Sequence, residues 1–120
     1  MSKDPTVYLT HILECIDLVE SYISGLNQGE FEGRQQVQDA VLRRIEIIGE
    51  AVKNLPEDLR KANPQVPWKQ IAGTRDKVIH DYLGVDVELI WNVADTLLPE
   101  LAHQVRDILS SLEPLDLEED

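Results

Sequence analysis

Residues 37–52 read VQDAVLRRIEIIGEAV, and the spacing of their apolar residues indicates the fold class. An aliphatic residue recurs every third or fourth position, which places one apolar stripe along an α-helix. The stripe consists of Val37, Val41, Ile45, Ile48 and Val52. This pattern predicts a helix from about residue 33 to 54 that packs its apolar face against other helices.

The same periodicity recurs on both sides of this segment. The predicted helices are residues 5–24, 33–54, 68–82 and 86–112, with a short helical turn over 56–62. Asp4 followed by Pro5 is a typical helix start, and Asp86 is the expected N-cap of the last helix. Pro99 should kink that helix, because proline removes one backbone hydrogen bond.

Four amphipathic helices with short connections predict an all-α fold, an antiparallel up-and-down four-helix bundle. No segment alternates apolar and polar residues with a period of two, so we expect no sheet. Residues 1–113 are predicted to form a single domain, and 114–120 an acidic, disordered tail. Wide apolar helix faces on so small a chain favour a two-fold homodimer.

Composition limits the kinds of function. The chain has 120 residues and a net charge of -12, from 23 acidic and 11 basic residues. Extended binding along a nucleic-acid backbone is therefore not expected, and contact with RNA would need a small basic site or a partner. The single cysteine, Cys15, and the absence of a long apolar run predict a cytoplasmic protein without a membrane span.

Arg75 is the anomaly in the predicted helix 68–82. On a helical wheel it falls at the centre of the apolar stripe, where an aliphatic residue is expected. A buried guanidinium needs a partner. One interpretation is a structural ion pair with Glu46 or Glu50; the other is an anion-binding role in a cleft or at a subunit interface.

His80 lies about 140° around the same wheel from Arg75. The two side chains would meet if the helix frays, or if two chains pack so that one cleft receives both. We therefore expect a composite site at a dimer interface. Asp76, four residues before His80, is predicted to hydrogen-bond it and to favour its protonated form. Tyr82 would finish the apolar stripe and extend its hydroxyl at the helix end.

The motif Arg75-x4-His80-x-Tyr82 resembles the signature of the HEPN superfamily, and more narrowly that of HepT-like toxins. Two further segments have counterparts in that family, in the same order. They are Gly49-Glu50-Ala51 and Val66-Pro67-Trp68, with Asp86 and Trp91 further downstream. The resemblance covers nearly the whole chain.

This resemblance implies a helical homodimer that acts as the toxin of a toxin–antitoxin module, a metal-independent endoribonuclease needing no cofactor. Arg75 and His80 would be the catalytic residues, and Asp76 would support them. Arg75 would stabilise charge on the phosphoryl group, and His80 would assist proton transfer. The partner would be a nucleotidyltransferase antitoxin of the MntA type, which would neutralise the toxin by attaching AMP to Tyr82.

A non-catalytic adaptor is the alternative: the same fold binding a nucleotide or a protein, with Arg75 in an interface ion pair. The net charge favours this alternative, whereas the complete Arg75, His80 and Tyr82 set favours the nuclease. The histidines and the cysteine lack the spacing of metal ligands, so no metal site is predicted. The doublet Arg43-Arg44 is predicted to be solvated or ion-paired, with Glu46 and Glu50 as candidate partners, rather than bound to phosphate.

Overall fold

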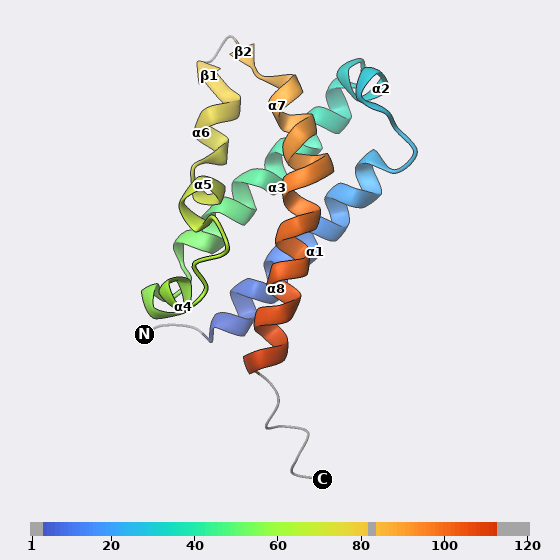
Figure 1. Cartoon of the computed structure of the whole chain (residues 1–120). Helices are drawn as coiled ribbons and strands as arrows, with labels where there is room; N and C mark the ends of the chain where they lie inside the picture. The colour runs from blue at the N-terminus through green and yellow to red at the C-terminus, as the bar shows by residue number, and fades with distance from the viewer. Residues whose placement is uncertain (1–3, 82–83, 113–120) are drawn as a thin grey trace.

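The computed structural model of the chain describes residues 4–81 and 84–112, with the backbone alone for His80 and Asp81. Its elements confirm the predicted all-α class (Figure 1). The helices are α1 Pro5–Ile23, α2 Gln28–Glu32, α3 Gln35–Lys53, α4 Glu57–Ala62, α5 Trp68–Ala72, α6 Thr74–Val78, α7 Val87–Asn92, the π-helix η1 Val93–Leu97, and α8 Leu98–Leu112. Two short strands, β1 Ile79–Asp81 and β2 Gly84–Val85, lie between α6 and α7.

The predicted helix starts are confirmed at both ends of the chain. The carboxylate of Asp4 accepts a hydrogen bond from the backbone N–H of Thr6 at 2.9 Å, which caps α1. The carboxylate of Asp86 accepts one from the N–H of Leu89 at 3.0 Å, which caps α7. Each cap satisfies an N–H group that the helix itself cannot pair.

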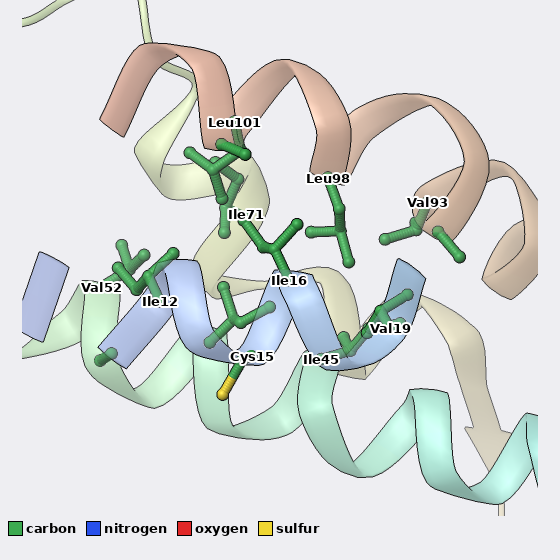
Figure 2. Close-up of a cluster of buried hydrophobic side chains, with 14 of the residues drawn as sticks. Ile12, Cys15, Ile16, Val19, Ile45, Val52, Ile71, Val93, Leu98 and Leu101 are labelled. Carbon is green, nitrogen blue, oxygen red and sulfur yellow. The ribbon is translucent and has the colours of Figure 1, made fainter. Parts of the chain in front are cut away.

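Most of the core lies between α1, α3 and α8. α1 and α3 run in opposite directions and pack along their length (Figure 1). Figure 2 shows Ile16 of α1 pointing toward Ile71 of α5 and Leu98 of α8, while the sulfur of Cys15 points toward α3. The predicted stripe of α3 is buried from Val41 to Val52. Each fully buried aliphatic side chain contributes about 1.5–3 kcal/mol, so this layer holds the bundle together.

The short helix α2 was not predicted. Asn27 and Glu30 form a reciprocal capping box at its start, and each side chain bonds the other residue's backbone N–H. Phe31 of α2 is fully buried, and its ring packs against Trp91 of α7 with centroids 5.3 Å apart. Residues 28–32 contain one large apolar side chain and so show no hydrophobic periodicity, which is why the sequence predicted no helix there.

The last helical segment is continuous but irregular. The π-helix η1 links α7 to α8, and the N–H of Leu98 bonds the carbonyl of Val93 five residues earlier. Pro99, the second residue of α8, lacks the N–H that an α-helix would use there. A π-helical turn lies just before Pro99, and the kink predicted at that proline stays a prediction.

The prediction of one helix over 68–82 is wrong. Gly73 separates α5 from α6, and α6 ends at Val78. The N–H of Gly73 bonds the carbonyl of Lys69, and the hydroxyl of Thr74 donates to the carbonyl of Gln70 at 2.8 Å. These bonds complete the last turn of α5, and the flexibility of glycine allows the chain to start a new helix after it.

The prediction of no sheet is also wrong, on a small scale. β1 and β2 pair antiparallel, with Ile79 opposite Val85. The N–H of Asp86 donates to the carbonyl of Val78 at 2.7 Å, which closes the hairpin at its base. Ile79 has extended backbone angles, with φ -105° and ψ 104°, so α6 ends at Val78 and the chain enters β1. Strands of two or three residues are too short to produce a visible alternation.

No helix in the part of the chain that the structure describes is long and apolar enough to span a membrane. The predicted acidic tail, 114–120, lies outside the described residues. The division into a domain at 1–113 and a tail therefore stays a prediction.

Candidate functional site

Arg75 lies on α6 with about half of its side chain exposed, 53%. The wheel that placed it at the centre of a buried stripe assumed an unbroken helix. The break at Gly73 changes the phase, so Trp68, Ile71 and Val78 are buried as expected while Arg75 faces outward. The predicted burial of Arg75 is therefore wrong, and no buried charge has to be compensated.

Glu46 of α3 is the main partner of Arg75. The Nε of Arg75 donates a hydrogen bond of 2.7 Å to Oε2 of Glu46, whose side chain is 27% exposed. The short distance is typical of a charge-assisted bond. This is the ion pair that the sequence offered as one of two interpretations of Arg75.

Two weaker contacts extend this pair. Nη1 of Arg43 lies 3.6 Å from Oε1 of Glu46, so the two carboxylate oxygens serve two different arginines. Nη1 of Arg75 lies 3.5 Å from Oδ1 of Asp76, whose side chain is 83% exposed. Exposed ion pairs at such distances contribute little to stability. The bond between Glu46 and Arg75 therefore sets the geometry.

Gly49 explains why α6 reaches Glu46. A Cβ built on Gly49 would lie 3.3 Å from the carbonyl oxygen of Ala72 and 3.6 Å from that of Ile71. The end of α5 thus rests directly on the backbone of α3, one helical turn from Glu46. α6 follows immediately, which brings Arg75 over that carboxylate. The Gly-Glu-Ala segment therefore has a steric role in building the site.

A groove of about 220 Å³ lies between α3 on one side and α5 and α6 on the other. It is lined by Glu46, Gly49, Glu50, Lys53, Ala72, Arg75 and Asp76. Among the described residues that line it, three carboxylates outnumber two cations, so these residues do not form a basic site by themselves.

Hydrogen bonding by Glu46, and the charge of that carboxylate, raise the pKa of the Arg75 guanidinium above its ordinary value. Asp76 acts in the same direction, more weakly. Arg75 therefore remains a cation throughout the pH range in which RNA is stable, and it can act as an electrostatic group but not as a proton donor or base.

His80 does not lie on the helix that carries Arg75. Its backbone belongs to β1, beyond the end of α6 at Val78, so the wheel angle between His80 and Arg75 has no meaning here. The predicted helical contact between Asp76 and His80 also requires a helix that the structure does not have. The side chain of His80 and the whole of Tyr82 lie outside the described residues, and their roles stay predictions.

A larger groove of about 500 Å³ lies elsewhere, between α5 and the last helices. Leu89, Val93 and Leu97 make it mostly apolar, and Glu100 is the one ionisable side chain among the described residues that line it. It shares no residue with the groove at Arg75 and offers little acid–base chemistry. Among the side chains that the structure describes, no three His, Cys, Asp or Glu residues lie together so as to hold a metal ion.

Comparison with known proteins identifies the class to which this fold and this motif belong. Residues 12–108 match the family described as ribonuclease HepT-like, and the chain belongs to that family. The match covers α3, α5, α6 and the hairpin, and so includes Glu46, Arg75 and His80. The predicted resemblance is confirmed.

Individual relatives agree with this assignment. "Putative RNase TTE0752" of Caldanaerobacter subterraneus is 47% identical over 108 residues, which cover 89% of this chain and 96% of the relative. "Probable ribonuclease HepT" of Thermococcus cleftensis is 40% identical over 101 residues, 84% of this chain and 92% of the relative. No solved structure matches the chain.

A third relative is longer than this chain. "Gamma-glutamylcyclotransferase and putative RNase MJ0434" of Methanocaldococcus jannaschii is 44% identical over 113 residues, 94% of this chain. The chain spans about half, 51%, of the length of that relative.

Proposed function

We propose that this protein is an endoribonuclease that cleaves RNA without a metal ion, with Arg75 and His80 as its catalytic residues. The observation that carries the proposal is the family match over 12–108, a range that contains both residues. Arg75 supports it, since its charged group is half exposed on a helix fixed against α3.

The chemistry would follow from the groups available. The 2′-oxygen of a ribose forms a bond to the adjacent phosphorus and loses its proton, while the bond from phosphorus to the 5′-oxygen breaks and that oxygen gains a proton. The products are a 2′,3′-cyclic phosphate and a 5′-hydroxyl. His80 moves one of these protons, and Arg75 stabilises the negative charge that builds up on the phosphoryl oxygens.

The site would be completed by a second chain. The groove at Arg75 contains three carboxylates and two cations, which is a poor environment for a phosphate. In a homodimer with the two motifs at a shared cleft, Arg75 and His80 of both chains would surround the RNA. The chain would act as a cytoplasmic toxin, held inactive by a nucleotidyltransferase antitoxin that attaches AMP to Tyr82. The added group would block RNA by its bulk and its negative charge.

The test is growth inhibition in a bacterial host expressing the chain without its antitoxin. We expect the parent chain to slow growth, and Arg75→Ala or His80→Ala to relieve the inhibition. Lys61→Ala on α4 is a matched control, because it removes one positive charge outside the groove. If the Arg75→Ala/His80→Ala double variant inhibits growth as strongly as the parent, the catalytic assignment is wrong.

A non-catalytic adaptor is the second candidate. Two observations favour it: the net charge of -12, and the engagement of Arg75 by a carboxylate of its own chain. An adaptor predicts that the parent and the double variant have the same effect on growth, so the same assay separates the two functions.

A further inference from the structure

Glu46 stands apart from the other acids around Arg75. Its Oε2 accepts the 2.7 Å bond from Nε of Arg75, and it is the most enclosed of the carboxylates that pair with that residue. Glu50 lines the same groove, but its carboxylate makes no ion pair in the described part of the chain. Glu46 therefore restrains Arg75, while Glu50 only contributes charge.

The atom that Glu46 binds determines how Arg75 is presented. A guanidinium is planar, with one donor edge formed by Nε and one Nη, and another formed by the two Nη groups. Because Nε is taken by Glu46, the outer edge formed by Nη1 and Nη2 remains for an anion. No acceptor in the described residues bonds Nη2, and the contact of Nη1 with Asp76 is long, at 3.5 Å.

The support under Glu46 is rigid. The residue lies in the middle of the 19-residue helix α3, between the buried Ile45 and Ile48. Its neighbour one turn along, Gly49, is in contact with the backbone of α5. A side chain held on such a scaffold fixes its partner with little loss of conformational freedom at the moment of reaction.

From this geometry we infer that Glu46 is a positioning residue for RNA cleavage, which directs the Nη edge of Arg75 toward the phosphoryl group. The inference rests on the proposed function, and it adds a residue outside the Arg-x4-His-x-Tyr motif. Glu46 is shared by Arg43 and Arg75, so it restrains Arg75 without being paired to that residue alone.

The experiment compares Glu46→Ala and Glu46→Gln with the parent chain in single-turnover cleavage of total cellular RNA. The maximal rate and the RNA concentration at half-saturation are measured for each. We expect Glu46→Ala to lower the maximal rate at least about tenfold, because misplacement of a catalytic group by an ångström costs up to about a hundredfold. The RNA concentration at half-saturation should change less than about threefold. Glu46→Gln should recover much of the rate, since its amide oxygen can accept the same bond from Nε.

Glu50→Ala is the control, since it removes a carboxylate from the same groove without touching the Arg75 contact. The positioning role is overturned if Glu46→Ala has the same maximal rate as Glu50→Ala, or if it changes only the RNA concentration at half-saturation. It is also overturned if Glu46→Gln lowers the maximal rate as much as Glu46→Ala does. In that case Arg75→Ala remains inactive and the proposed function stands. Both the positioning role and the proposed function are overturned if the parent chain cleaves no RNA, or if Arg75→Ala cleaves RNA as fast as the parent.

Loss of folding is separated by thermal melts of every variant. If Glu46→Ala is unfolded at the assay temperature, Glu46→Gln is compared with Glu46→Asp. The glutamine keeps the length of the side chain, whereas the aspartate keeps the charge but withdraws it by one methylene. Positioning predicts that the glutamine variant cleaves faster, and a faster aspartate variant overturns it.

Discussion

Gly49 of α3 and Ala72 of α5 meet so closely that a Cβ on Gly49 would lie 3.3 Å from the carbonyl oxygen of Ala72. The two residues are 23 positions apart in the sequence. Their contact joins α5 to α3 and so brings Arg75 to Glu46. The geometry of the site therefore depends on a residue that has no side chain.

Gly49→Ala should destabilise the fold by about 1 kcal/mol. Replacing a glycine within a helix gains up to about 1 kcal/mol, whereas overpacking costs about 1–3 kcal/mol when backbone must move. Urea denaturation measures the difference. Gly29→Ala in α2 is the control, because its Cβ would meet its nearest neighbour at an ordinary 3.5 Å, and it should be neutral or stabilising. Equal stability changes for the two variants would show that the helix contact tolerates a methyl group.

Mixed dimers should regain activity if the shared cleft can combine Arg75 of one chain with His80 of the other. Arg75→Ala and His80→Ala subunits should be inactive alone. In a dimer of one with the other, the shared cleft holds one Arg75 and one His80, which come from different chains. Co-expression with two affinity tags isolates this mixed species, and we expect about half the parent activity. An inactive mixed dimer would place each catalytic pair within a single chain, and a monomer by light scattering would exclude the shared cleft.

Tyr82 should be the acceptor of AMP. Incubation of the chain with ATP and a nucleotidyltransferase antitoxin should raise its intact mass by one or more AMP units and abolish RNA cleavage. Tyr82→Phe removes the hydroxyl and keeps the ring, so its mass should not change. The chain also has Tyr8 and Tyr22, and their phenylalanine variants serve as controls. A mass increase that persists in Tyr82→Phe would assign the modification elsewhere.

Cys15 should be unreactive in the folded chain. Burial raises the pKa of its thiol above the ordinary value of 9.0, although the nearby Arg44 opposes the shift. Iodoacetamide at pH 8 should therefore react at least about a hundredfold more slowly than in urea, because reaction must await unfolding. Reaction of the folded chain at the rate of a free thiol would contradict the burial of Cys15.

The same shift predicts a pH dependence of stability. Above pH 9 the unfolded chain loses the thiol proton before the folded chain does, so the free energy of unfolding falls as pH rises. At pH values below the pKa of the thiol in the unfolded chain, the contribution of Cys15 to the free energy of unfolding is fully present. Cys15→Ala should lose this part of the dependence, and an unchanged slope between pH 8 and 10 would assign it to other groups.

Periodicity and capping were sufficient to predict the long helices. α1 begins after Asp4 and α7 after Asp86, as the sequence indicated, because these caps act locally. The region after Trp68 was not predictable in the same way. The bond from the Thr74 hydroxyl to Gln70 completes α5 at Gly73, and α6 ends where the Asp86 N–H bonds the Val78 carbonyl in the hairpin. A helical wheel drawn through 68–82 takes neither bond into account.

The wrong prediction of one helix over 68–82 also affected the description of the candidate site. Glu46 was named as a possible partner of Arg75, and the 2.7 Å bond confirms that pair, but a wheel drawn through Gly73 could not give the exposure of Arg75. The steric role of Gly49 depends on how α5 crosses α3, which no local pattern records. The identities of His80 and Tyr82 as functional residues still rest on the motif.

Metal-independent catalysis by Arg75 and His80 is best tested by RNA cleavage with the purified chain in the presence of EDTA. Total cellular RNA is incubated with the parent, Arg75→Ala, His80→Ala and Lys61→Ala chains, and the newly formed ends are analysed. We expect the parent and Lys61→Ala chains to produce 2′,3′-cyclic phosphate and 5′-hydroxyl ends without metal, and the other two variants to produce almost none. Cleavage that stops on addition of EDTA, or that persists in the Arg75→Ala or His80→Ala chain, would show that the proposed mechanism is wrong.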